Sequence, residues 1–529
     1  MENKKMKIIS IASIIALALT LVTATYAFFV AQTGEGAQTD IKINANTVDT
    51  FTFEAGSALN LSLNQENFAS GKGNQTGTTF AKAMLTANNK TNTATEHYYL
   101  YLNISNNTFT YSIDNNTPEI LLSIKDGSNN EITSVSGLTY KTVTDGKGAS
   151  IKGFDITTKS GLITILNNRE ITTTSTKTEQ WNVTVTFVNY NANQAGNAGK
   201  RFSAKLMIQQ EKILTVLSDV CTSGNNLATC ITTLSNKSEP SIVNIYHHDS
   251  SLANGARDNS YRYAGANPNN FVCFGTTESP CPTDNLYRII GVINDKVKLI
   301  KYDYMTTDEL GTDGDYSQTY KEWGMDSTYK GTYGDGERIG VYYWNYKATG
   351  SATNTWSTSL LNKTNLNTNF INNIGTTWAN KIATVTWKVG GNTWANIGTK
   401  TSSVAYTNEI TNPVTTNTTD NATTYSAKIG LMYVSDYGFA ASPDAWTLTM
   451  SSYNNTTATN NNWMYMGLYE WTISRYADNS ISAFDVFYDG YVYNYFVNNY
   501  SGVRASFNLE SSVSYVSGSG SMSDPIVIN

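Results

Sequence analysis

The amino-acid sequence predicts a mainly β protein in which an antiparallel β-sandwich is followed by an α+β domain. Between about residue 40 and residue 212, short stretches of alternating apolar and polar residues are separated by turns rich in Asn and Gly. Many short strands with regular turns are typical of an antiparallel sandwich. From about residue 258 the aromatic content rises, and every Trp except Trp181 lies in this second half. Large aromatic side chains at this density predict one extensive core.

Length and composition limit the classes of protein to which the chain can belong. A chain of 529 residues is long enough for several domains, each with its own core. Charged residues make up only 15% of it and the formal net charge is −6. Because this leaves no basic field, we expect no nucleic-acid partner. The 34 Tyr, 18 Phe and 10 Trp also exclude an intrinsically disordered chain.

The N-terminal residues predict an export signal. A basic segment, residues 4–7, precedes an apolar run over residues 8–30, as in a secretory leader. We expect a signal peptide over residues 1–27, cleaved after Ala27, and an extracellular or cell-surface location. A second interpretation stays open, because the run is long enough to remain as an anchor helix that ends at residue 30. The uncleaved leader would then hold the protein at a membrane.

The sandwich is predicted over residues 28–212. Its clearest strands are 98–104, 119–124, 181–188 and 202–208. An unpaired sheet edge is a template for another chain, so a strand near residues 28–40 would allow self-association through the sandwich edge. The alternative is a monomeric spacer sandwich, and the sequence does not decide between the two.

Residues 213–257 are predicted to form a connector, with a short helix over 213–220 followed by the first cysteine loop. The connector ends in His247-His248-Asp249. Adjacent histidines point in different directions on a helix or a strand. No nucleophile motif accompanies them, so we expect a structural or solvated role rather than acid-base chemistry.

Four cysteines in an exported chain predict disulfides. They form two close pairs, and of the three connectivities we expect the local one, Cys221 with Cys230 and Cys273 with Cys281. Neither pair has the Cys-x-x-Cys spacing and supporting His of a zinc site. We therefore expect no metal at these thiols.

The α+β domain is predicted over residues 258–529. Period-2 and helical patterns, with the residues that end them, define its elements. These are a hairpin of strands 286–293 and 296–300 around Asn294-Asp295, a helix over 356–374 that ends at Gly375, a strand over 427–434 and a short helix over 436–441.

An aromatic hairpin is the most informative segment of this domain. Asp489-Gly490 is a strong signal for a two-residue type I′ turn. Such a turn would pair Tyr488 with Tyr491, Val486 with Tyr493 and Phe484 with Tyr495 on one face. Rings on that face either contact a ligand or pack into a core, and both interpretations stay open. On the first, the ligand-binding residues are Trp463, Tyr488, Tyr491, Tyr493 and Asn498.

Several motifs in residues 284–509 carry a resemblance to a known family. They are Tyr343-Trp344-Asn345, Trp356-Ser357 with Leu361 through Phe370, Gly430-Leu-Met-Tyr-Val-Ser435, Trp471-Thr-Ile-Ser-Arg475, the Asp489-Gly490 turn and Gly502-Val-Arg504. Together they resemble DUF6273, a functionally uncharacterised domain of bacterial surface proteins that is related to C-type lectins and formylglycine-generating enzymes. The resemblance implies a C-type-lectin-like fold for residues 258–529.

Within this resemblance, Arg504 lies in an apolar terminal strand, where a buried guanidinium needs a carboxylate such as Glu470. The residues expected to hold the fold together are Arg504, Glu470, Trp471 and Gly502. Ala505 stands where the family usually has Pro. Formylglycine-generating enzymes act through late cysteines, and the chain has none after Cys281, which excludes that activity.

The sequence gives no support to a calcium-dependent lectin. The elements Glu-Pro-Asn, Gln-Pro-Asp and Trp-Asn-Asp, which hold calcium in C-type lectins, do not occur. The acidic cluster of Asp308, Glu309, Asp313 and Asp315 lacks the spacing of an EF-hand. A solvated loop is expected there, with calcium binding left open, and we expect no cofactor.

These observations favour an exported, adhesin-like binding protein that recognises a glycan or a surface protein through the aromatic and Asn-rich C-terminal module. The leader ending, Ala24-Thr-Tyr-Ala27-Phe-Phe29, and the sandwich resemble camelysin-like and biofilm-matrix fibre proteins of Gram-positive bacteria. A structural subunit of a surface fibre is therefore the alternative. A glycan-acting hydrolase is a minor alternative that would use Asp485 and Glu470 as a carboxylate pair. Since none of the common catalytic motifs occurs, we expect that the protein is not an enzyme.

Overall fold

The computed structural model describes residues 49–529, except for 69–70, 89–91, 320–328, 332–338, 347–351, 414–421, 455–457 and 459–460. The expected signal peptide and the expected edge strand near residues 28–40 lie outside the described residues. The chain divides after Lys212 into two units. Among the described residues, no helix is both long and apolar enough to cross a membrane.

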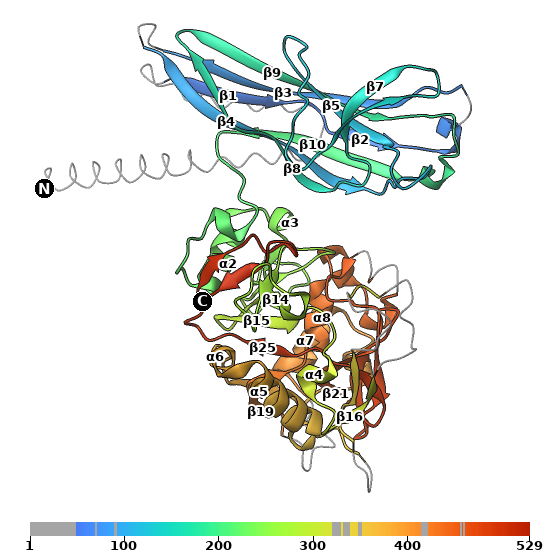
Figure 1. The fold of residues 1–529 in the computed structure, drawn as a ribbon, viewed down its shortest axis with the longest axis vertical. Helices are drawn as coiled ribbons and strands as arrows, with labels where there is room; N and C mark the ends of the chain where they lie inside the picture. Colours follow the sequence, from blue (N-terminus) through green and yellow to red (C-terminus); the bar gives the residue numbers. More distant parts are fainter. Residues whose placement is uncertain are drawn as a thin grey trace, which may run out of the picture. The chain divides into compact units, whose positions relative to one another are not determined.

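The N-terminal unit is an antiparallel β-sandwich of two sheets (Figure 1). One sheet has the strand order β1-β3-β9-β5-β7-β6, and the other has the order β2-β10-β4-β8. The strands are β1 (Thr50–Ala55), β2 (Leu59–Ser62), β3 (Gln75–Thr86), β4 (Ala94–Asn107), β5 (Ile120–Asp126), β6 (Tyr140–Thr144), β7 (Ser150–Asp155), β8 (Gly161–Thr173), β9 (Thr176–Phe187) and β10 (Arg201–Gln209). Two 3-10 turns, η1 (Gln65–Phe68) and η2 (Ala195–Asn197), lie between them.

The alternating sequence pattern explains the sandwich. In β3, Ala81, Ala83 and Leu85 are buried, whereas the intervening Met84 is exposed. Successive side chains of a strand point to opposite faces, so each strand contributes one apolar face to the core. Burial of this apolar surface is the main favourable term in folding, at roughly 25 cal/mol per Å².

One carboxylate lies inside the sandwich and is satisfied by neutral donors. Glu119 is fully buried and accepts hydrogen bonds from Ser112 Oγ (2.7 Å), Gln194 Nε2 (2.9 Å) and Asn197 Nδ2 (2.8 Å). Buried polar groups are tolerated when they are hydrogen-bonded in this way. Hydroxyl and amide groups therefore take the place of a counter-ion here.

The C-terminal unit is an α+β domain, and its described strands form three sheets (Figure 1). The largest has the order β20-β25-β15-β14-β13-β27-β26, with β12 pairing both β14 and β11 beside it. The second has the order β16-β17-β24-β21-β22-β23, and the third pairs β18 with β19. The strands are β11 (Ile245–His247), β12 (Tyr261–Tyr263), β13 (Phe271–Cys273), β14 (Leu286–Ile293), β15 (Lys296–Lys301), β16 (Tyr316–Thr319), β17 (Gly340–Tyr343), β18 (Val385–Lys388), β19 (Thr424–Ala427), β20 (Ile429–Gly430), β21 (Glu470–Arg475), β22 (Ser482–Val486), β23 (Val492–Phe496), β24 (Tyr500–Gly502), β25 (Ser506–Asn508), β26 (Tyr515–Ser517) and β27 (Ile526–Ile528).

Short helices surround these sheets. They are η3 (Leu217–Asp219), α2 (Leu227–Lys237), α3 (Pro240–Val243), η4 (Thr283–Asn285), α4 (Thr307–Leu310), η5 (Trp356–Thr358), the π-helix η6 (Leu361–Phe370), α5 (Ile371–Asn373), α6 (Gly375–Ala379), η7 (Trp394–Asn396), α7 (Ser402–Tyr406), the π-helix η8 (Thr407–Thr411), α8 (Val434–Ala440), η9 (Pro443–Thr447) and η10 (Met450–Ser452).

Residues 213–257 are part of this unit and not a separate connector. The helix expected over 213–220 is reduced to η3, and the first regular helix is α2, which the sequence analysis did not predict. The side chain of Asn226 caps α2 by accepting a hydrogen bond from Thr229 N at 2.9 Å. The residues that α2 contributes to the main core are Leu227, Cys230, Ile231 and Leu234.

The other expected elements of the C-terminal unit are present with different bounds. Asn294 and Asp295 have φ of 50° and 60°, as a two-residue type I′ turn between β14 and β15 requires. The helix expected over 356–374 is η5, η6 and α5, and the chain continues beyond Gly375 as α6. The strand expected over 427–434 is limited to the end of β19 and to β20, and the helix expected over 436–441 is α8, which begins at Val434.

Both predicted disulfides are present in the C-terminal unit. Cys221 is bonded to Cys230 with a Cα–Cα distance of 5.7 Å, and Cys273 to Cys281 with 5.9 Å. The first joins α2 to the segment that precedes it, and the second joins β13 to the loop that follows it. The disulfides indicate an oxidising, extracellular environment.

Candidate functional site

The aromatic hairpin is formed by β22 and β23, but its register differs by one residue from the prediction. The observed pairs include Val486 with Val492, Asp485 with Tyr493 and Phe484 with Asn494. Phe487 N donates a hydrogen bond to Tyr491 O at 2.9 Å, so the loop has three residues, Tyr488-Asp489-Gly490. Gly490 has a φ of 96°, and a left-handed Gly is what closes a three-residue hairpin loop.

The shift moves side chains from one face of the hairpin to the other. Phe484, Val486 and Val492 lie in an apolar core with Trp446 and Tyr437, so the expected pairing of Val486 with Tyr493 is wrong. The opposite face is aromatic. We call it the ring face, and its members are Tyr469, Phe487, Tyr488, Tyr491, Tyr493 and Tyr495.

The rings of this face contact one another and are partly open to solvent. The centroid of Phe487 lies 4.6 Å from that of Tyr491 and 4.7 Å from that of Tyr469. Tyr488 is 42% exposed and Tyr493 is 43% exposed. In the part of the chain that the structure describes, no side chain or backbone group hydrogen-bonds the hydroxyls of Tyr488, Tyr491 and Tyr493. Their donors and acceptors are available to water or to a ligand.

A buried carboxylate lies on the same side of the hairpin. Asp485 pairs across the strands with Tyr493, so the two side chains share a face. Its side chain is fully buried, and neither carboxylate oxygen has a hydrogen-bond partner among the described residues. Burial raises the pKa of the Asp485 carboxyl well above its usual range. Burial without a described partner therefore disfavours the charged form of this group.

Glu470 and Arg504 form the ion pair that the sequence predicted. Arg504 Nε lies 2.8 Å from Glu470 Oε1, and both side chains are buried. Glu470 pairs with Val486 and the adjacent Trp471 with Asp485, which places Glu470 and Asp485 on opposite faces of the sheet. The two carboxyl groups do not converge, so the pair required by a hydrolase is not formed by these residues.

Trp471 and Gly502 are packed inside the same sheet. Trp471 is fully buried and donates from Nε1 to Tyr342 O at 2.8 Å. A Cβ on Gly502 would come within 2.6 Å of the Tyr304 ring, so a larger residue does not fit without displacing that ring. Asn498 is exposed in the turn between β23 and β24.

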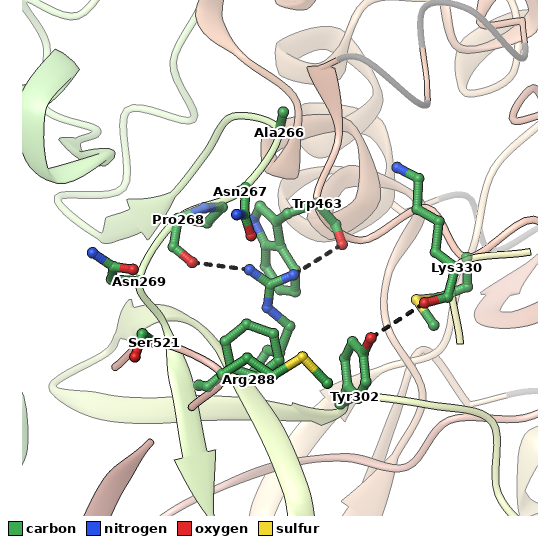
Figure 2. A pocket seen from close by; sticks show the side chains of 12 residues that line it. Ala266, Asn267, Pro268, Asn269, Arg288, Tyr302, Lys330, Trp463 and Ser521 are labelled. Carbon is green, nitrogen blue, oxygen red and sulfur yellow. Dashed lines mark hydrogen bonds between the residues drawn. The ribbon is translucent and has the colours of Figure 1, made fainter. Parts of the chain in front are cut away.

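Trp463 does not belong to the ring face. It is buried in the core on the other side of the hairpin, and its Nε1 donates to Tyr263 O at 2.9 Å. It also lines a pocket of about 270 Å³, where the guanidinium of Arg288 lies 4.7 Å from its ring (Figure 2). The pocket is lined by Ala266, Asn267, Pro268, Asn269, Phe271, Arg288, Tyr302, Lys330, Trp463, Met466, Ser521 and Met522.

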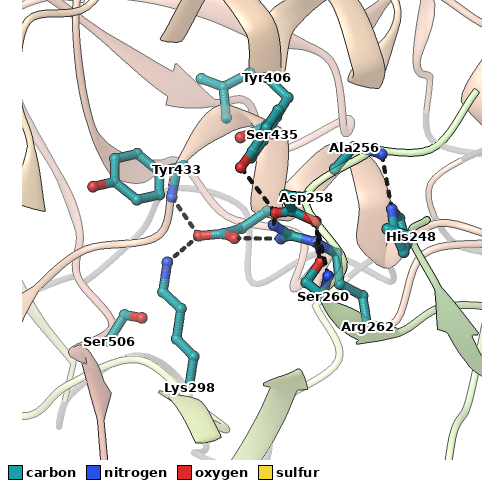
Figure 3. A network of polar contacts seen from close by, with 12 residues as sticks. His248, Ala256, Asp258, Ser260, Arg262, Lys298, Tyr406, Tyr433, Ser435 and Ser506 are labelled. Atoms are coloured by element: carbon teal, nitrogen blue, oxygen red, sulfur yellow. Dashed lines mark hydrogen bonds and ion pairs between the residues drawn. The ribbon is translucent and has the colours of Figure 1, made fainter. Parts of the chain in front are cut away.

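A buried polar network holds the centre of the unit together (Figure 3). Arg262 bridges Asp258 at 2.9 Å and Asp436 at 3.1 Å, and Lys298 bonds the second oxygen of Asp436. Tyr406 donates its hydroxyl to Asp258 at 2.8 Å. Two cations meet two carboxylates, so the charges balance inside the fold. The network connects β12, β15, α7 and α8. Its donors and acceptors bond one another, which indicates that it stabilises the fold and does not bind a ligand.

Three residues of the acidic cluster, Glu309, Asp313 and Asp315, have structural partners. Glu309 pairs with Lys301 at 2.9 Å, and the Asp315 carboxylate accepts hydrogen bonds from Tyr346 N and Leu361 N. Across the described residues, no group of three His, Cys, Asp or Glu side chains has the arrangement to hold a metal. His248 is buried, and burial lowers its pKa to about 3, so the imidazole is neutral.

No protein-family model matches the chain, and no curated protein matches it. The resemblance to DUF6273 and to camelysin-like proteins therefore stays a prediction. Sequence reasoning missed Arg288 and its pocket. One sequence feature could have indicated this site: Arg288 is an isolated arginine within the apolar strand Leu286–Ile293. A cation buried in such a strand needs a partner.

Proposed function

We propose that the protein is an exported surface protein that binds a glycan through the ring face of its C-terminal unit. The observation that carries the proposal is a cluster of contacting rings, of which Tyr488 and Tyr493 are more than two-fifths exposed. Monomeric proteins rarely leave a contiguous apolar patch open without a binding role. Aromatic faces stack on the apolar faces of sugar rings, and the tyrosine hydroxyls bond sugar hydroxyls.

The surroundings of the ring face support a binding role. The opposite face of the hairpin is packed into the core through Phe484, Val486 and Val492, so the rings are carried on a rigid element. A rigid platform loses little conformational entropy when a ligand binds. Trp394 packs edge-on against Tyr493 with centroids 4.8 Å apart and extends the aromatic surface.

Export is part of the proposal. It is supported by the predicted leader and by the two disulfides, which suit an oxidising compartment. A C-type-lectin-like fold for the C-terminal unit, as the DUF6273 resemblance implies, is part of it too. A fold of that kind does not determine the ligand, so the ligand class is argued from the ring face alone.

The experiment is a glycan-array screen and a pull-down with the full chain. We expect binding to at least one glycan class, and we expect the double variant Tyr491→Ser with Tyr493→Ser to lose it while circular dichroism stays unchanged. Tyr346→Ser is the matched control, because Tyr346 is 44% exposed and outside the ring face. A double variant that is folded and binds as the wild type does would move the site elsewhere. Capture of a protein with no glycan bound would make the ligand a protein.

A fibre subunit is the second candidate, and one feature of the sandwich favours it. β8 is 13 residues long and ends its sheet, so one side of the strand has no described neighbour in that sheet. An edge of this length is a template for another chain. Electron microscopy of the chain without residues 1–27 tests it: fibres are expected if the sandwich assembles, and monodisperse particles if it does not.

A further inference from the structure

Four arginines of the C-terminal unit, Arg262, Arg288, Arg475 and Arg504, are almost completely buried, and of these Arg288 lines a pocket. Arg262 has two carboxylate partners and Arg504 has one. Arg288 is 5% exposed and forms no ion pair with any residue that the structure describes. A buried cation without a counter-ion is costly, since its desolvation is not compensated by an opposite charge.

The hydrogen-bond acceptors of Arg288 are all neutral. Its guanidinium donates to Asn270 Oδ1 at 2.7 Å, to Pro268 O at 3.0 Å and to Trp463 O at 3.4 Å. These three bonds use three of the five N–H donors of a guanidinium. The remaining donors have no acceptor among the described residues.

Two aromatic rings fix the guanidinium at the wall of the pocket (Figure 2). Its central carbon lies 4.2 Å from the centroid of Phe271 and 4.7 Å from that of Trp463. Phe271 is the direct cross-strand neighbour of Arg288 on β13. Stacked in this way, the planar group is oriented for a planar, two-oxygen partner such as a carboxylate.

The charged groups at the pocket favour the binding of an anion. Burial, and secondarily the charge of Arg504, lowers the pKa of Arg288 to about 9. Lys330 also lines the pocket, and burial followed by the charge of Arg288 lowers its pKa to about 8. Two cations that repel each other across one pocket attract an anion there.

We propose that the Arg288 pocket binds the carboxylate of an acidic sugar unit. The guanidinium takes the carboxylate, while the rings of Phe271, Trp463 and Tyr302 and the amides of Asn267 and Asn269 suit the sugar ring and its hydroxyls. A pocket of about 270 Å³ is near the lower end of ligand-site volumes and suits a single unit. This site shares no residue with the ring face, so it does not rest on the proposed function.

The first test is calorimetric titration of the full chain with sodium glucuronate and with glucose, which has CH₂OH in place of the carboxylate. We expect saturable binding of glucuronate and none of glucose. Arg288→Met is expected to weaken glucuronate binding at least about tenfold, because one partner of a buried charge pair is removed. Arg201→Met is the matched control, since Arg201 is an exposed arginine of β10 in the other unit.

Sodium acetate and sodium sulfate separate an acidic sugar from anions in general. If either binds as tightly as glucuronate, the sugar assignment is overturned. If wild type shows no saturable glucuronate binding up to about 10 mM, the whole proposal fails. A crystal of the wild-type chain soaked with glucuronate tests the site without any variant. We expect electron density for glucuronate next to Arg288. Density at another place would overturn the assignment. The ring-face variant is expected to bind glucuronate normally, which distinguishes this site from the proposed function.

Discussion

The two units of the protein differ in how their buried charged side chains are paired. In the sandwich, ion pairs such as Lys82 with Glu54 lie at the surface, and the buried carboxylate of Glu119 is satisfied by amides and a hydroxyl. In the C-terminal unit, Arg504 pairs with Glu470 inside the core, and Asp485 is buried with no partner among the described residues. Removal of one charged partner is therefore expected to cost more in the C-terminal unit than at the surface of the sandwich.

Arg504→Ala tests the most expensive of these interactions. The variant leaves the buried Glu470 carboxylate unpaired, so we expect the C-terminal unit to lose about 3–5 kcal/mol of unfolding free energy. Calorimetry of the full chain should show the transition of the C-terminal unit moved to lower temperature and that of the sandwich unchanged. An unmoved transition of the C-terminal unit would contradict the comparison.

The disulfides sharpen the comparison, because both lie in the C-terminal unit. Replacing Cys273 and Cys281 together by Ser removes a short covalent loop, and in the chain-entropy model this costs about 2 kcal/mol. Urea unfolding should show the loss only in the transition of the C-terminal unit. A loss in the sandwich transition instead would show that the two units do not unfold separately.

Asp485→Asn tests whether the buried carboxyl without a described partner destabilises the fold. Its effect on the free energy of unfolding is expected to depend on pH. The folded state raises the pKa of Asp485, so above the ordinary Asp value of about 4 the unfolded chain releases a proton that the folded chain retains. The contribution of Asp485 to stability is therefore largest below about pH 4 and decreases as the pH rises. We expect Asp485→Asn to stabilise the unit more at pH 7 than at pH 4, because only the carboxyl becomes costlier to keep folded as the pH rises. Melting curves at the two pH values measure this, and an equal change at both would refute the assignment.

Lys82→Ala gives the smallest expected effect. The Lys82 side chain is 32% exposed and the Glu54 side chain 36% exposed, so solvent screens their 3.1 Å ion pair. We expect the sandwich to lose less than about 0.5 kcal/mol. A loss comparable to that of Arg504→Ala would remove the difference between the two units.

The sequence predicted the sandwich better than the C-terminal unit for a physical reason. Strands such as 98–104 and 181–188 are regular in pattern, and regular alternation specifies both the strand and its buried face. The hairpin at Asp489-Gly490 was located correctly, but its register depended on whether Tyr488 joins the loop. The register is determined by the packing of Phe484, Val486 and Val492 in the core. The local sequence pattern carries no information about this packing.

The candidate sites show the same limit. The exposed rings of Tyr488 and Tyr493 and the pair of Arg504 with Glu470 follow from local sequence and from the need to neutralise a buried charge. The Arg288 pocket does not follow from local sequence, because its lining comes from six separate segments of the chain. Trp463 was expected beside the hairpin tyrosines, and only the tertiary fold places it against Arg288 instead.

The last strand of the C-terminal unit sets a condition on the timing of folding. β27 pairs in parallel with β13, so Val272, near the start of the unit, lies beside Ile526, near its end. Contacts between such distant positions form late, since almost the whole unit must be available first. The largest sheet thus remains incomplete during synthesis until residues 526–528 are available. A short deletion at this strand should therefore do more damage in the cell than its few side-chain contacts suggest, because the unfinished sheet stays open to proteases.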